Sequence, residues 1–406
     1  MSNIPVNQKT VTIRNIPVEQ KKLTMSNLKQ YGMMLALFLI YAIFAFLSDG
    51  KNAAPMNINN LVMQNSYVVI LSLGMLLCCL TANVDLSVGS VVAFCGAAAA
   101  IMVIDYHIAI PVTFAIVLAM GVLVGMWQGF FIAVLKVPPF IVTLANMLVF
   151  RGLTMVILNG QTKGPLPQGF TQVGAGYLPQ VFIQVGGTKV ELLALIAGIL
   201  VSIVLILLEM RFRHNKIKHG FAVLPVWQSI SKLVVVIAVL NFISVKLALY
   251  MGLPLVLLLM LILILIYSFI TNNTVAGRQV YAVGGNVNAA RLSGINTDKV
   301  MFWVYTNMGF LAGLAGIVLA ARNASATPKA GDSFEMDAIA ACYIGGAAVQ
   351  GGSGTISGAV IGALIMGILN NGMSLIGWSV DIQRVVKGLV LLAAVTFDLY
   401  NKRKSS

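Results

Sequence analysis

Long apolar stretches separated by short polar segments dominate this sequence and decide what it can fold into. A helix needs about 20 mostly apolar residues to cross a membrane. Unbroken runs of this kind favour helices over a closed barrel, because each helix satisfies its own backbone hydrogen bonds. We therefore predict an all-α, polytopic membrane protein with about 10–12 transmembrane helices. The candidate stretches lie near 31–47, 61–82, 87–104, 109–135, 140–158, 190–208, 229–250, 252–270, 300–320, 336–351, 354–377 and 383–399.

Two of these stretches are weaker than the others. The stretch 140–158 carries Arg151, and 336–351 is short and rich in glycine. Either of them is compatible with a broken or re-entrant helix. The lower end of the predicted range of crossings depends on these two stretches.

The composition excludes several classes of protein. Hydrophobic residues make up 59% of the 406 residues and charged residues 9%, against about 25% charged in an ordinary soluble domain. So few charges cannot cover a soluble surface, which excludes a cytosolic enzyme, a secreted disulfide scaffold and a disordered chain. The four cysteines lie in apolar stretches without a CxxC pair, and the three histidines fall in predicted loops. We expect neither a metal site nor a cofactor.

Basic residues predict the orientation in the membrane. Placing the N-terminus inside and alternating the spans puts most Lys and Arg in cytoplasmic loops, as the positive-inside rule requires. The net charge of +14 therefore belongs to the membrane topology, and we expect no nucleic acid as a partner. This gives cytoplasmic tails at 1–30 and 400–406, a permease region over 31–399 and an external loop over 159–189.

Glycine repeats mark close helix contacts. Four-residue spacing places successive glycines on one helix face, where another backbone can approach closely. The bland interpretation is ordinary bundle packing, and the functional one is that these smooth faces slide during transport. The repeats are Gly121, Gly125 and Gly129, then Gly354, Gly358 and Gly362, and the pair Gly309 and Gly313.

Polar residues inside spans need a reason, because lipid solvates them poorly. Asp85 and Asp337 each sit where a span starts, so each is either a helix cap or part of a polar pathway. Arg151 is the one charge that we expect deep in the membrane. A chain of acids and histidines for proton relay is not evident, which favours a neutral solute.

The stretch 271–299 is too polar to span and falls on the cytoplasmic side. Gly284, Gly285 and Asn286 predict a turn. A short helix follows, with Asn286 as its N-cap and Gly294 as its end. The pattern places Ala289, Ala290 and Leu292 near one face of this helix and Arg291 on the other.

This stretch resembles a known family. The segment GRQVYAVGGNVNAARLSGI (277–295) is similar to the cytoplasmic coupling segment of bacterial ABC transporter permeases for ribose, xylose, arabinose and galactose. Further similarity lies in VDLSVGS (84–90), KVPPFIVTLANMLVFRGL (136–153), EMDAIAACYIGGAAVQGGSGTISGAVIGA (335–363) and QRVVKGLVLLAAV (383–395). Met336 and Tyr343 depart from the usual Leu and small aliphatic residue. Together the motifs cover most of residues 30–400 and resemble the xylose and multiple-monosaccharide permeases most closely.

The resemblance implies a permease subunit of an ATP-driven monosaccharide importer in the bacterial inner membrane, multi-pass and surrounded by lipid. It implies three partners: a separate ABC ATPase subunit, a periplasmic sugar-binding protein and a second permease copy in a homodimer. No G-x-x-x-x-G-K-[ST] motif occurs in this chain, so ATP hydrolysis is expected elsewhere and no catalytic residues are expected here. The coupling segment would span 277–299.

Two sets of candidate site residues follow. Those expected to contact the ATPase are Gly284, Gly285, Asn286, Ala289, Ala290, Arg291, Leu292 and Gly294. Those that could line a sugar pathway are Gln64, Asn65, Asp85, Asn146, Asn307 and Asn371, although helix–helix hydrogen bonding explains each of them equally well. The alternative function is a secondary carrier or facilitator that works alone on a small neutral solute.

Overall fold

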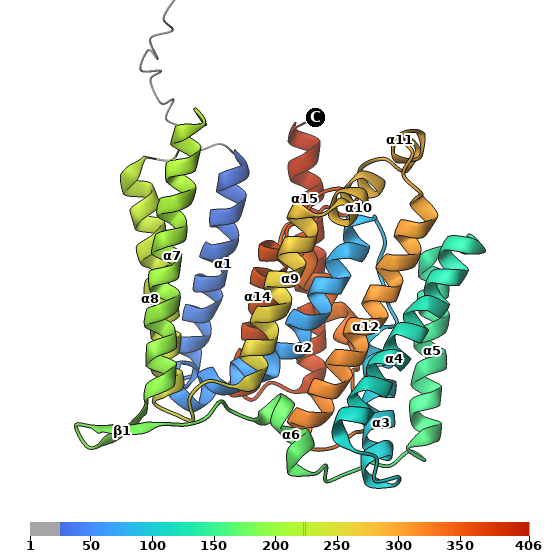
Figure 1. The fold of residues 1–406 in the computed structure, drawn as a ribbon, viewed down its shortest axis with the longest axis horizontal. Helices are drawn as coiled ribbons and strands as arrows, with labels where there is room; N and C mark the ends of the chain where they lie inside the picture. The colour runs from blue at the N-terminus through green and yellow to red at the C-terminus, as the bar shows by residue number, and fades with distance from the viewer. Residues whose placement is uncertain (1–24, 222, 224, 406) are drawn as a thin grey trace, which may run out of the picture.

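The computed structural model describes residues 25–405 apart from 222 and 224, and within these residues the fold is almost entirely helical (Figure 1). The prediction of an all-α membrane protein is confirmed. One small hairpin, β1 (Phe182–Val185) and β2 (Thr188–Glu191), lies in the external loop and was not predicted. The helices of the first half are α1 (Met25–Leu47), η1 (Lys51–Ala53), α2 (Pro55–Leu80), α3 (Val88–Ile104), α4 (Ile110–Gly129), η2 (Phe130–Val134), α5 (Pro139–Ile157) and α6 (Gln168–Ala175). Those of the second half are α7 (Leu192–Lys218), α8 (Val226–Ala248), α9 (Leu255–Asn273), α10 (Val275–Gly285), α11 (Val287–Leu292), α12 (Thr297–Asn323), α13 (Phe334–Ile344), α14 (Ile356–Leu375) and α15 (Val380–Ser405).

A helix lies in every stretch that the hydropathy pattern predicted, although in 336–351 it ends at Ile344 and a loop follows. Within the described residues, 8 helices are long and apolar enough to cross a membrane. The stretch with Arg151 is one continuous helix, α5, so the suspected break there is not present. The predicted tail boundaries fall inside helices, since α1 begins at Met25 and α15 runs to Ser405. The part of the N-terminal tail before residue 25 lies outside the described residues.

Two helices, α3 and α13, are too short to cross a membrane alone. They have 17 and 11 residues, which is about 25 and 16 Å at 1.5 Å per residue, against a hydrocarbon core of about 30 Å. Their N-terminal ends meet inside the bundle. A Cβ added to Gly89, in the first turn of α3, would lie 2.1 Å from the carbonyl oxygen of Gly331, just before α13. Backbone breaks of this kind are tolerated only where protein surrounds them.

The bundle contains two units that are built alike. In one, α3 follows α2 and packs against α5 and α12; in the other, α13 follows α12 and packs against α15 and α2. Each unit therefore inserts its short helix against the long first helix of the other. This exchange places α2 and α12 at the centre, where both are buried along most of their length.

The predicted glycine grooves account for the closest helix contacts. A Cβ on Gly121 would lie 2.5 Å from the Gly309 carbonyl oxygen, and one on Gly125 would lie 2.7 Å from the Thr306 Cα, so the grooves of α4 and α12 pack into each other. On α14, a Cβ on Gly362 would lie 1.9 Å from the Ala341 carbonyl oxygen of α13. The close packing is confirmed, whereas sliding of these faces stays a prediction.

The two ends of the bundle differ in what they carry. The C-terminus and α11 lie at one end, whereas α6 and the β1–β2 hairpin lie at the other (Figure 1). We call these the inner and the outer end, following the predicted orientation. The hairpin of α7 and α8 stands at the edge of the bundle, and most of its apolar side chains are exposed, as expected of helices that face lipid.

Candidate functional site

Local capping shapes the coupling segment at the inner end. The Asn286 side chain accepts a hydrogen bond from the Ala289 backbone N–H at 3.0 Å and so caps α11, as predicted. Thr274 caps α10 and Asn296 caps α12 in the same way. Gly294 follows the end of α11 with a φ of 81°, a conformation that glycine adopts without strain. The segment is therefore an ordered unit of two short helices.

The coupling segment is seated directly on two other elements. A Cβ on Gly284 would lie 1.5 Å from the carbonyl oxygen of Leu80, so α10 presses against the inner end of α2. The same carbonyl accepts a hydrogen bond from the Gly352 backbone N–H at 2.8 Å. The Tyr281 hydroxyl donates to the Gly354 carbonyl at 2.8 Å, and burial raises the pKa of this phenol. The inner end of α2, α10 and the loop after α13 thus form one contact surface.

Above this seat, α11 presents a small exposed surface. Leu292 is 90% exposed, which is unusual for a leucine outside the lipid-facing helices, and Val287 is 45% exposed. The predicted faces are wrong in one respect: Ala290 is buried against the protein, whereas Ala289 and Leu292 are exposed. The reason is that the small Ala290 side chain packs inward, which leaves Leu292 without a protein contact that would cover it.

Arg291 is held beside the start of α12. Its guanidinium donates to the Thr297 hydroxyl at 3.4 Å. The neighbouring Asp298 forms an ion pair with Lys136, which precedes α5. The first contact joins α11 to α12, and the second joins α12 to the segment before α5. The Lys136–Asp298 pair is exposed, so it contributes little to stability.

Asp85 lies in the break between α2 and α3. It is buried, and its Oδ1 accepts hydrogen bonds from the Ser87 backbone N–H at 2.9 Å and from the Ser87 hydroxyl at 2.7 Å. Gln128 of α4 donates to the same hydroxyl. The carboxylate therefore shapes the turn that precedes α3, and Ser87 holds the N-cap position itself. Its partner Gln128 was not identified from the sequence.

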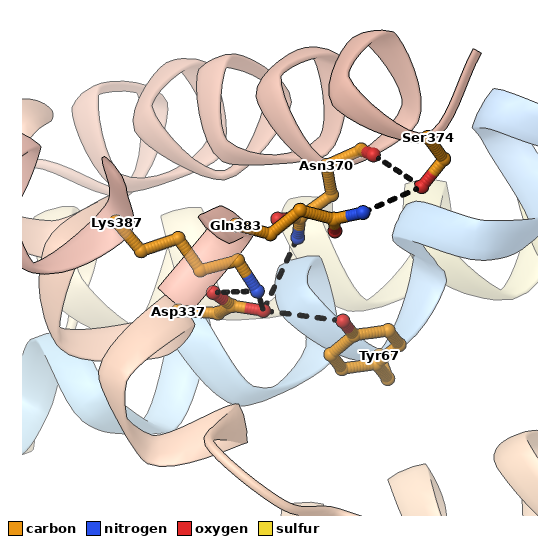
Figure 2. A network of polar contacts seen from close by, with 6 residues as sticks. All are labelled: Tyr67, Asp337, Asn370, Ser374, Gln383 and Lys387. Atoms are coloured by element: carbon orange, nitrogen blue, oxygen red, sulfur yellow. Dashed lines mark hydrogen bonds and ion pairs between the residues drawn. The ribbon is translucent and has the colours of Figure 1, made fainter. Parts of the chain in front are cut away.

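Asp337 is the centre of a second buried network, shown in Figure 2. Its carboxylate forms an ion pair with Lys387 of α15, with Nζ at 3.0 Å from Oδ1 and 3.1 Å from Oδ2. The Tyr67 hydroxyl and the Asn370 amide each donate to Oδ2 at 3.2 Å. Asp337 of α13 therefore contacts side chains of three other helices, α2, α14 and α15.

This network continues towards an exposed surface. The Ser374 hydroxyl donates to the Asn370 carbonyl at 2.8 Å, and the Gln383 amide donates to the Ser374 hydroxyl at 3.3 Å. Arg384, one helical turn before Lys387, pairs with Asp332 at 2.5 Å. Polar side chains of α13, α14 and α15 therefore form a row that begins at the buried Asp337 and ends at exposed side chains of α15.

Two sequence-based expectations need correction here. Arg151 was expected to be the one deep charge, but Asp337 and Lys387 form a buried pair as well. Arg151 itself is satisfied, because it donates to the Ala330 carbonyl at 2.6 Å. Lys387 was missed because its partner lies 50 residues away and its surroundings in the sequence resemble an ordinary span. The interior therefore holds an acid–lysine pair that the preference for a neutral solute, based on the scarcity of deep acids, did not take into account.

The remaining pathway candidates do not converge on one cavity. The Tyr267 hydroxyl donates to Asn307, and Asn371 exchanges two amide hydrogen bonds with Asn57, of 2.9 and 3.0 Å. Both are helix–helix contacts. Asn146 is buried on α5, and Asn65 is buried against Gly367 with no hydrogen-bond partner for its amide among the described residues. The last candidate, Gln64, is half-buried on α2.

The fold is that of a helical membrane permease. It has long apolar helices, two short helices whose ends meet inside the bundle, and an ordered coupling segment at the inner end. Comparison with known proteins agrees with this class. The model of the family described as branched-chain amino acid transport system / permease component matches residues 57–395. The chain belongs to this family.

Relatives are similar along nearly their whole length. The xylose transport system permease protein of Haemophilus influenzae is 37% identical over 377 residues, 93% of this chain and 98% of that protein. The xylose transport system permease protein of Escherichia coli K12 is 37% identical over 383 residues, 93% of each chain. The ribose import permease protein of the same strain is 34% identical over 377 residues, 93% of this chain and 95% of that protein. No solved structure matches this chain.

These matches confirm the resemblance drawn from the coupling segment and the motifs. The chain is a multi-pass membrane permease of the ABC importer type, as predicted, and it is a transport subunit, not an enzyme.

Proposed function

We propose that this chain forms the translocation pathway of a bacterial monosaccharide importer, in the inner membrane, and is driven by a separate ATPase that grips α11. The observation that carries the proposal is the seat of the coupling segment on the inner end of α2, where Gly284 contacts the Leu80 carbonyl. A force applied to α11 reaches the bundle through this contact.

The seat supports a mechanism for coupling. Leu80 ends α2 just before the break that precedes α3, and Gly352 lies in the loop after α13. When the ATPase closes on α11, α10 would move both elements together, because Gly352 is hydrogen-bonded to the same carbonyl. The bundle then needs two stable arrangements, and the ATPase biases which one is populated.

A pentose such as xylose is the substrate that we favour. Two of the relatives named above are xylose permeases and one is a ribose permease. Asp337 and Lys387 neutralise each other, so this buried pair carries no net charge that would select an ion. A sugar offers hydroxyls to groups such as the Asn65 amide and the Asn146 Nδ2, which have no hydrogen-bond partner among the described residues. Each such hydrogen bond contributes only about 0.5–1.5 kcal/mol net, which suits passage more than retention.

We further propose a periplasmic sugar-binding protein that delivers the sugar, and a second copy of this chain. The resemblance to monosaccharide permeases supports both partners. The alternative is a carrier that works alone. The coupling segment favours an importer driven by an ATPase over a carrier that works alone. Its Leu292 is 90% exposed at the inner end, which suits contact with a partner protein.

Reconstitution tests the function. Proteoliposomes are prepared with the permease in the membrane, its ATPase in the lumen and the delivery protein outside. They should accumulate D-xylose only when ATP is enclosed in the lumen with the ATPase. Flux of D-xylose through the permease alone would support the stand-alone carrier and contradict the proposal.

A matched pair of variants tests whether α11 binds the ATPase. Leu292→Asp should reduce co-purification of the ATPase, because it places a charge on the exposed contact surface. Phe221→Asp is the control, since Phe221 is also exposed, at 64%, and follows α7 at the same end. Equal loss of the ATPase in both variants, or in neither, would remove the assignment.

Accessibility of cysteines tests the orientation. The four native cysteines are buried, so a membrane-impermeant maleimide should leave them unlabelled in intact cells. Gln184→Cys in the hairpin should be labelled from outside, and Asn215→Cys near the end of α7 should react only after permeabilisation. The reverse pattern would overturn the topology.

A further inference from the structure

The outer end carries a long stretch of chain without any charged side chain. Residues 164–188 contain no Lys, Arg, Asp, Glu or His, although they include several glutamines. Loops at a water-exposed surface normally carry charges. A surface that excludes charge yet keeps amides suits a partner that is neutral and rich in hydrogen-bonding groups.

A cavity lies within this stretch. It has a volume of about 440 Å³, within the range of about 300–1,000 Å³ that is typical of small-molecule sites. One wall is α6, and the other is the chain that follows it together with Met251, which lies in the turn between α8 and α9. The residues that matter most for its chemistry are Gln168, Thr171, Gln172, Tyr177, Gln180 and Met251.

The cavity is held open by fixed backbone. The Leu178 backbone N–H donates to the Leu253 carbonyl at 3.0 Å, and the Leu255 N–H donates to the Gly176 carbonyl at 2.9 Å. The Gln180 amide donates to the Met251 carbonyl at 2.7 Å. Two chain segments that are far apart in sequence are thereby joined into one wall of the cavity. Such preformed geometry reduces the entropy lost when a ligand binds.

The side chains offer the two kinds of contact that a sugar ring requires. Gln168 and Gln172 are exposed on α6 at successive turns, so their amides can donate to and accept from hydroxyls. The Tyr177 ring and the Met251 side chain supply apolar surface for the C–H face of the ring. We infer that this cavity is an external, low-affinity binding site for a neutral monosaccharide. The inference rests on the proposed sugar import and adds a station that precedes the membrane pathway.

The site is connected to the centre of the bundle. The Tyr177 hydroxyl accepts a hydrogen bond of 2.9 Å from Asn59, a buried residue of α2. On the other wall, Gly174 of α6 packs so closely on α12 that a Cβ there would lie 2.5 Å from the Val318 carbonyl oxygen. The two walls of the cavity therefore contact both central helices at their outer ends. The inner end of α2 is where the coupling segment is seated.

Binding to the permease alone tests the inference. The purified full-length permease in lipid nanodiscs, without ATPase or delivery protein, should give saturation-transfer NMR signals from millimolar D-xylose. Gln172→Ala and Gln168→Ala should each weaken binding about two- to tenfold, the change expected for one lost hydrogen bond. Gln184→Ala in the β1–β2 hairpin is the matched control, because it removes the same side chain outside the cavity. This control should bind like the wild type.

Two results would overturn the inference. One is the absence of a D-xylose signal from wild-type permease, or a signal that neither cavity variant changes. The other is variants that weaken binding of the delivery protein and leave the D-xylose signal unchanged, which would make the cavity a docking surface. Failure of the proposed function is distinguishable, because it would appear as the absence of ATP-dependent uptake in the complete assembly whatever the permease alone binds.

Discussion

A single methyl group at the seat of the coupling segment should disconnect the ATPase from the membrane helices. In Gly284→Ala, the new Cβ would lie 1.5 Å from the Leu80 carbonyl oxygen and 2.7 Å from the Gly352 backbone nitrogen. Both neighbours are backbone atoms that cannot rotate away. Contacts of Cβ atoms below 3.0 Å essentially never occur, so α10 has to move away from α2 by about 1.5 Å.

The cost of this displacement sets the expected magnitude. Overpacking of a close contact costs about 1–3 kcal/mol, which corresponds to about a five- to 150-fold change in the equilibrium that links the coupling segment to the bundle. The measurement is ATP hydrolysis by the assembled importer with and without sugar-loaded delivery protein. We expect basal hydrolysis to persist and its stimulation by sugar to fall at least fivefold.

A glycine outside the coupling segment provides the control. Nothing lies within 4 Å of a Cβ placed on Gly152 of α5. Gly152→Ala should therefore retain stimulation and also match Gly284→Ala in membrane abundance. Normal stimulation in Gly284→Ala, or equal loss in both variants, would refute the view that the contact with Leu80 transmits the motion.

Two further substitutions test the interior of the bundle. Asp337→Asn should lower the free energy of unfolding by about 3–5 kcal/mol, because it leaves Lys387 buried without its counter-charge, and the double variant with Lys387→Met should recover much of this loss in a thermal melt. Asp381→Asn is the control and should have no effect, because this carboxylate is 90% exposed. An Asp337→Asn variant as stable as the wild type would contradict the role of the buried pair. Gly125→Ala should lower the free energy of unfolding by about 1–3 kcal/mol, because its Cβ would meet the backbone of α12. Gly152→Ala is the control: nothing lies within 4 Å of its Cβ, so it should melt like the wild type. Equal melting temperatures of the two variants would show that α4 and α12 separate without cost.

Several features could be read from the sequence because they depend on neighbours along the chain. Hydropathy located every membrane helix, since the bilayer imposes a length of about 20 apolar residues. The Asn286 cap and the turn at Gly294 were predicted correctly, because capping involves groups within three or four residues of each other. The motif of the coupling segment also identified the family, which the comparisons confirm.

Other features were decided only by the tertiary structure. The sequence showed glycine grooves but not that Gly121 meets Gly309, and it showed a polar Asp337 but not the lysine that neutralises it. It also gave no sign that Leu292 would be left uncovered while Ala290 packs inward. The physical reason is that lipid supplies no hydrophobic force to order helices against one another. Which faces meet is therefore set by close packing and buried polar pairs between residues far apart in the chain.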